Sequence, residues 1–95
     1  MLNPAYGKHV IVALDKIEFD PSRRALWNAI CDAIDLVCDR PDGAQARREA
    51  LRLPSGKTVW QVPIRRFLED DDWVLLWYLD GAEAVIVYVG SRMFR

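Results

Sequence analysis

Residues 58–90 decide the fold and read TVWQVPIRRFLEDDDWVLLWYLDGAEAVIVYVG. At the start of this stretch apolar side chains occupy alternate positions, so Trp60, Val62 and Ile64 share one face of an extended chain. A period of two is typical of a β-strand. Pro63 lacks an amide hydrogen, so we expect this strand at a sheet edge or at a bulge.

Two further apolar runs follow, over residues 73–79 and 84–89. Runs without alternation are typical of strands that are central in a sheet or covered on both faces. The Asp80-Gly81 pair between them is favoured in tight hairpin turns. The whole stretch therefore predicts a three-stranded antiparallel meander.

The N-terminal half predicts one strand and two helices. Residues 10–14 form a short, β-branched apolar run, which favours a strand. Asp20-Pro21 predicts a helix start, because Asp caps free amides and Pro is tolerated in the first turn. Apolar residues then recur at helical spacing as far as Cys38, and a second, shorter helix is predicted over residues 44–51.

These elements predict an α+β fold in the order β-α-α-β-β-β. It has a small, mainly antiparallel four-stranded sheet, with the two helices packed on one face. A chain of 95 residues has room for one domain, residues 1–95. Such a domain buries roughly 60–65% of the surface that its unfolded chain exposes. This size excludes a two-domain enzyme with a deep interdomain cleft.

No apolar run reaches the roughly 18–20 residues that span a bilayer, and the first residues lack the basic-then-apolar order of a signal peptide. We therefore expect a cytoplasmic protein with no membrane partner. Cys31 and Cys38 are separated by about 10 Å along a helix, too far for a disulfide. We expect two reduced core thiols rather than redox or metal-binding groups.

The net charge of −1 conceals a segregation of charge along the chain. Residues 40–66 carry seven basic and two acidic side chains, a net +5, whereas residues 67–83 carry six acidic and no basic ones. A local basic patch is therefore compatible with the near-neutral total. We expect the acidic run at 69–72 to be a solvated hairpin loop, since its spacing does not fit a calcium site.

Three segments resemble the RelE/ParE superfamily of bacterial toxins, which are encoded beside an antitoxin. Residues 84–92 resemble the strand, Val-Gly pair and catalytic Arg of RelE, and residues 59–65 and 73–80 resemble its second and third strands. The resemblance implies cleavage of messenger RNA on the ribosome. In that chemistry the 2′-hydroxyl attacks the phosphate, and cations stabilise the developing charge. The resemblance to RelE also implies catalytic roles for Arg92 and Arg65.

Other cations are candidates for substrate binding: Arg66, Lys57, Arg52, Arg48 and Arg95. The sequence contains neither a Gly-rich phosphate loop nor a Cys/His cluster, so we expect no cofactor and no metal. The catalytic base is unassigned. We expect His9 to be solvated at the start of the first strand, and Glu49 to be a weak ion-pair partner near Arg52.

The sequence also departs from the nuclease pattern. Gln61 and Pro63 stand where the resembled nucleases carry lysines, and Asp72-Trp73 stands where they carry an Arg. The tail also lacks the Tyr or His of some members. These departures and the near-neutral charge favour a ParE-like protein that inhibits DNA gyrase by binding, whereas the ending at residues 90–92 favours the nuclease.

A third reading is an inactive relative that serves as an antitoxin-binding module. The partners that the resemblance implies are a cognate antitoxin and either the ribosome with messenger RNA or DNA gyrase. The resemblance is compatible with either a homodimer or a toxin–antitoxin hetero-oligomer, and the sequence leaves the oligomeric state open. The same arginines could bind an acidic segment of the antitoxin.

Overall fold

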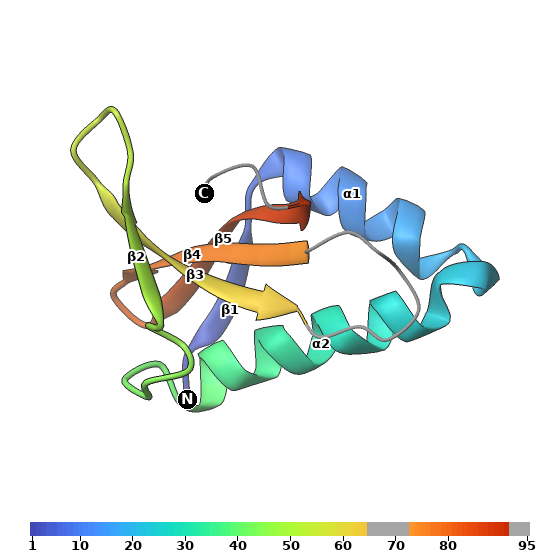
Figure 1. Ribbon diagram of the computed structural model, residues 1–95, viewed down its shortest axis with the longest axis horizontal. Helices are drawn as coiled ribbons and strands as arrows, with labels where there is room; N and C mark the ends of the chain where they lie inside the picture. Colours follow the sequence, from blue (N-terminus) through green and yellow to red (C-terminus); the bar gives the residue numbers. More distant parts are fainter. Residues whose placement is uncertain (65–72, 92–95) are drawn as a thin grey trace.

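The computed structural model describes residues 1–64 and 73–91 and shows an α+β fold built on one five-stranded sheet (Figure 1). The strand order is β1-β5-β4-β3-β2, in which β1 runs parallel to β5 and the other neighbours are antiparallel. The elements in chain order are β1 (Asn3–Tyr6), α1 (Lys8–Glu18), the 3-10 helix η1 (Pro21–Arg23), α2 (Arg24–Asp39), β2 (Glu49–Arg52), β3 (Thr58–Ile64), β4 (Trp73–Asp80) and β5 (Glu83–Ser91).

The predicted meander is confirmed as β3, β4 and β5. Trp60 pairs with Trp77 across β3 and β4, and Leu75 pairs with Val89 across β4 and β5. The hairpin between β4 and β5 turns at Gly81, whose φ of 60° lies in the left-handed region that glycine adopts without a steric penalty. Only a register shift at Leu76/Trp77 interrupts the ladder between β4 and β5.

The predicted strand at residues 10–14 is wrong, because this segment lies inside α1. Val10, Leu14 and Ile17 are buried at helical spacing, whereas Ile11 and Val12 are about half exposed. The helical spacing of apolar residues continues past residue 14 to Ile17. Burying that one apolar face of a helix stabilises the chain more than the β-propensity of the short β-branched run does. His9 is consequently an exposed side chain of α1 rather than the start of a strand.

The first strand is instead β1, an edge strand. It pairs in parallel with β5, in a register that sets Ala5 opposite Val85 and Tyr6 opposite Ile86. Three of its four residues are exposed, so it has no apolar alternation that a sequence pattern could detect. Pro4 removes one amide hydrogen from β1, which is a common way to protect a sheet edge from further pairing.

The predicted second helix at residues 44–51 is also wrong. The chain makes turns as far as Arg47 and then forms β2, which pairs antiparallel with β3 from Glu49↔Gln61 to Arg52↔Thr58. The sheet therefore has five strands and one parallel pair, rather than the predicted four mainly antiparallel strands. The first predicted helix is confirmed as η1 and α2, and the Asp20 carboxylate accepts a hydrogen bond from the Ser22 amide at 3.0 Å.

The predicted edge strand at Pro63 is wrong for the strand as a whole, because β3 lies between β4 and β2, but at Pro63 itself β3 has no neighbour on the β2 side among the described strands. The pairing of β2 with β3 ends at Gln61, so within the described strands only β4 lies beside Pro63. The missing amide hydrogen therefore costs the sheet no bond to β2.

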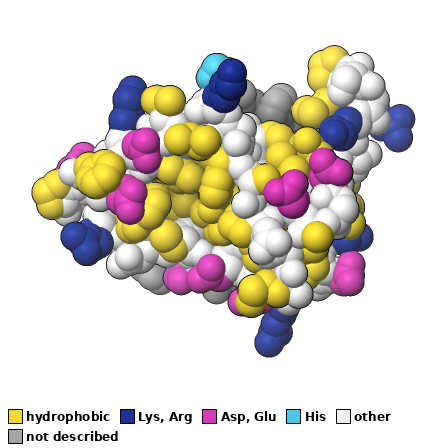
Figure 2. All heavy atoms as spheres, turned by 180° about the vertical axis from the view of Figure 1, so that it is seen from behind, with side chains coloured by type: hydrophobic (Ala, Val, Ile, Leu, Met, Phe, Trp, Pro, Cys, Tyr) yellow, Lys and Arg dark blue, Asp and Glu magenta, His cyan; other side chains and the backbone are white. Residues whose placement is uncertain are grey.

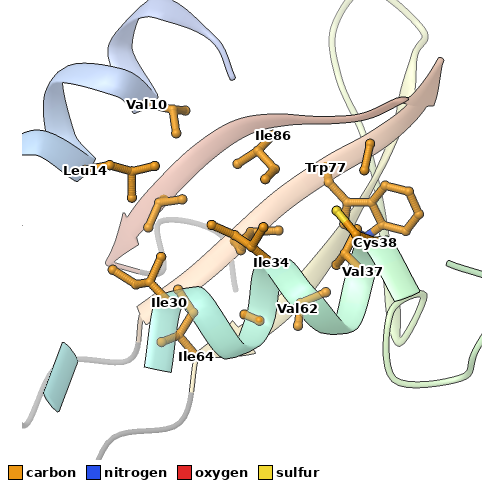
Figure 3. Close-up of a cluster of buried hydrophobic side chains, with 14 of the residues drawn as sticks. Val10, Leu14, Ile30, Ile34, Val37, Cys38, Val62, Ile64, Trp77 and Ile86 are labelled. Carbon is orange, nitrogen blue, oxygen red and sulfur yellow. The ribbon is translucent and has the colours of Figure 1, made fainter. Parts of the chain in front are cut away.

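The core lies between the two helices and one face of the sheet. Figure 3 shows Val10 and Leu14 from α1 and Ile30 and Ile34 from α2 among the buried side chains between the helices and the sheet, with Ile30 beside Ile64 of β3. Trp77 lies at the other end of this core and is fully buried. Its indole Nε1 donates a hydrogen bond of 2.8 Å to the backbone carbonyl of Ala46, which joins the sheet to the turns after α2.

Among the described residues, no helix is both long enough and apolar enough to cross a membrane.

We predict that Trp77→Phe lowers the free energy of unfolding by about 2–4 kcal/mol, because it removes ring volume and leaves the Ala46 carbonyl without its donor. Trp27→Phe is the matched control, since Trp27 is only partly buried, and it should cost less than about 1.5 kcal/mol. Urea unfolding followed by circular dichroism measures both. Equal losses in the two variants would contradict the role assigned to the indole.

Candidate functional site

The candidate site lies at the end of the sheet where β3 and β5 finish and β4 begins. Both β3 and β5 are antiparallel to β4, so they run in the same direction and end on the same side. The register places Ile64, Trp73 and Ser91 in one row across the three strands. Two strand spacings, about 10 Å, separate Ile64 from Ser91.

The two candidate catalytic arginines follow this row in the sequence. Arg65 comes directly after Ile64, and Arg92 comes directly after Ser91. Both arginines lie outside the described residues, as do the candidate substrate-binding residues Arg66 and Arg95. The acidic run at 69–72 lies outside them too.

A described cation, Arg23, also lies at this row. Its guanidinium carbon is 5.5 Å from the centre of the Trp73 ring, within the range of a cation–π contact. Arg23 comes from η1, at the start of the helical segment that packs on this face of the sheet. No local pattern in the sequence connects residue 23 with the start of β4, so Arg23 was not predicted at this site.

Tyr88 stabilises the end of β5 beside this row. Its hydroxyl donates a hydrogen bond of 2.6 Å to the backbone carbonyl of Ser91. A Cβ added to Gly90 would lie 2.7 Å from the same hydroxyl, so this arrangement of Tyr88 requires glycine at position 90. The Val-Gly pair that carried the family resemblance therefore has a local structural reason.

We predict that Gly90→Ala and Tyr88→Phe each lower the free energy of unfolding by about 1 kcal/mol, because each removes the same hydrogen bond. The added methyl group displaces a flexible side-chain end, so the fold should survive. The double variant should cost little more than either single one in a double-mutant cycle measured by urea unfolding. Fully additive losses would show that the two residues act independently.

Two of the other candidate cations lie far from the row. Arg52 and Lys57 flank the turn between β2 and β3, at the opposite end of β3 from Ile64. That strand spans about 20 Å. Lys57 Nζ lies 3.6 Å from the centre of the Tyr78 ring on β4, and Arg52 is exposed and forms no ion pair with a described residue. The structure therefore does not bring these two residues together with the row.

Arg48 lies closer to the row. It lines a cleft with Val62 and Pro63, which precede Ile64 on β3, and with Leu36 of α2. Its neighbour Arg47 is used structurally instead. The Arg47 side chain donates to the Pro41 carbonyl at 2.7 Å and to the Asp42 carboxylate at 2.9 Å, and its guanidinium lies 4.3 Å from the centre of a Trp60 ring.

Gln61 occupies a position where the resembled nucleases carry a lysine, and its side chain is buried. Only 2% of it is exposed, and its Nε2 donates a hydrogen bond to the Glu49 carboxylate. Glu49 lies directly opposite Gln61 in the pairing of β2 with β3. Gln61 and Glu49 therefore form a structural contact between β3 and β2, and neither side chain supplies a cation at the candidate site.

Both cysteines are free thiols, and Cys38 belongs to the core as predicted, whereas Cys31 is only partly buried. Burial raises the pKa of the Cys38 thiol, and the carboxylates of Asp35 and Asp39 raise it further. Burial and the nearby Asp35, Asp32 and Glu18 carboxylates likewise raise the pKa of Cys31. The described residues contain no group of three or more His, Cys, Asp or Glu side chains arranged to hold a metal ion.

We predict that both thiols react slowly with iodoacetamide at pH 8, because a raised pKa keeps them protonated and the thiolate is the nucleophile. Cys38, which is buried, should react about tenfold or more slower in the folded chain than in guanidinium. Cys31→Ser and Cys38→Ser variants let mass spectrometry follow one thiol at a time. Equal rates in folded and unfolded chains would contradict this prediction.

No family model, no curated protein and no solved structure matches this chain in sequence or in fold.

Proposed function

We propose that this chain is the toxin of a bacterial type II toxin–antitoxin pair, of the RelE/ParE kind, which blocks translation by cleaving messenger RNA on the ribosome. One observation carries the proposal. β3 and β5 end in a single row, and arginines follow both ends in the sequence, while Arg23 lies at the same row against Trp73. Two arginines therefore follow, in the sequence, strands that end at this row, and a third cation, Arg23, lies at the row itself.

The chemistry of RNA cleavage gives arginines near such a row a specific use. When the 2′-hydroxyl attacks the phosphate, negative charge develops on the non-bridging oxygens and on the leaving oxygen. The guanidinium group of arginine binds phosphate oxygens through two parallel hydrogen bonds. Arg65 and Arg92 would act on the reacting phosphate, and Arg23 would hold the adjoining backbone.

An exposed apolar surface supports the presence of a protein partner. Exposed apolar side chains come from β1, from α1 and from the cap of α1: Tyr6, Ile11, Val12 and Phe19. Figure 2 shows apolar side chains gathered across the middle of the molecule, with charged side chains around them. Apolar side chains gathered on one face are typical of protein interaction sites. The proposed occupant is the cognate antitoxin, in the bacterial cytoplasm.

We predict that induction of this chain alone arrests growth of a bacterial host and produces new messenger 5′ ends in phase with codons. Arg92→Ala and Arg65→Ala should each reduce cleavage by about 10²–10³-fold, because each removes a group that stabilises the transition state. Arg23→Ala should reduce it less. Arg24→Ala is the matched control, because Arg24 is the exposed neighbour of Arg23 in the sequence and should cleave normally.

Circular dichroism of each purified variant confirms that the fold is kept. Normal cleavage by Arg92→Ala would contradict the assigned role of Arg92. Unimpeded growth on induction of the unaltered chain would contradict any toxin function and favour an inactive, antitoxin-binding relative.

One observation favours a second candidate, a ParE-like inhibitor that binds DNA gyrase and breaks no bond. Gln61 is buried against Glu49, so β3 presents no cation at that position. If this candidate is correct, induction should trigger the DNA damage response while messages stay intact. Purified chain should also inhibit supercoiling by gyrase.

A further inference from the structure

A cleft opens beside the candidate site, where β3 has lost its outer neighbour. It lies between α2 and β3 and is lined by Leu36, Gln45, Arg48, Val62 and Pro63. Its volume is about 120 Å³. This is several times the roughly 30 Å³ that one water occupies in the liquid, but well below the roughly 300–1,000 Å³ of a pocket for a drug-sized molecule. The cleft has room for one flat ring.

The walls and the mouth of the cleft differ in chemistry. Leu36, Val62 and Pro63 supply apolar walls from a helix and a strand whose backbones are fixed by the fold. Gln45 and Arg48 are exposed side chains from the segment between α2 and β2. The amide of Gln45 can both donate and accept, and the exposed guanidinium of Arg48 places a positive charge at the mouth of the cleft.

We propose that this cleft is a nucleobase subsite, which takes one unstacked base of a single-stranded RNA while Arg48 binds the adjoining phosphate. Proteins read single-stranded RNA by stacking a splayed base on a side chain and by hydrogen-bonding its edge. Here the base inserts between Leu36 and Pro63, and Gln45 reads its edge. An acidic side chain of a protein partner fits less well, because it has no ring to fill the apolar part.

The position of the cleft fits this assignment. Val62 precedes Ile64 by two residues, so the cleft lies about 7 Å along β3 from the row of Ile64, Trp73 and Ser91. This is close to the length of one nucleotide. A base held in the cleft therefore sets which phosphate reaches the row. The choice of RNA as substrate rests on the proposed function, whereas binding at the cleft can be tested without it.

The test is an NMR titration of the full chain, without ribosomes, with each of the four ribonucleoside 5′-monophosphates. The side-chain amide of Gln45 and the Nε–H of Arg48 should shift saturably, with an affinity that depends on the base. Arg48→Ala should weaken binding about tenfold or more, since it removes a charged hydrogen bond. Gln45→Ala should reduce the differences between bases, and Arg24→Ala, at the far end of α2, should bind normally.

Three results would overturn the subsite. The first is an equal response to inorganic phosphate at the same concentrations, and the second is equal weakening by Arg24→Ala. The third is saturation of the same signals by a glutamate-rich pentapeptide while nucleotides cause no shift, which would make the cleft a protein docking site. Nucleotide binding without growth arrest would contradict only the proposed function. Codon-phased cleavage without nucleotide binding would contradict only the subsite.

Discussion

The hydrogen bond from the buried Trp77 indole to the Ala46 carbonyl is the constraint on which the arrangement of the site depends. Trp77 is fully buried in the central strand β4, so its N–H needs a partner inside the protein. The segment after α2 supplies that partner by turning over the sheet instead of continuing as a helix. Arg47 stabilises the same turns through Pro41, Asp42 and Trp60. The position of these turns determines where β2 begins and how much of β3 it covers.

The short length of β2 has a consequence at the other end of β3. Because the two strands pair only as far as Gln61, the side of β3 next to Val62 and Pro63 opens onto the cleft with Leu36 and Arg48. The alternation of side chains along the strand buries Gln61 against Glu49 on one face and leaves Val62 on the face that α2 covers. A single strand thus separates a structural polar contact from a candidate binding surface.

Much of the fold follows from local patterns. The period of two near Trp60, the two apolar runs and the Gly81 turn predicted the meander, and the Asp20-Pro21 start predicted α2. The patterns failed at residues 10–14, where a β-branched run is too short to distinguish a strand from one turn of a helix. They failed again at residues 44–51, where the contacts of Ala46 and Arg47 with distant aromatic rings outweigh helix propensity. β1 has no apolar alternation and gains its place only by pairing with β5.

The sequence by itself determined the class of the fold, the central meander, the free thiols and the positions of arginines directly after two strands. Those features depend on residues close together in the chain, whose spacing fixes which face a side chain occupies. Only the tertiary structure decided that Ile64, Trp73 and Ser91 share a row, that Arg23 lies at that row, and that Arg48 borders a cleft. Such neighbours come from segments far apart in the chain, and they are set by strand register and by burial of the core, which no local pattern contains.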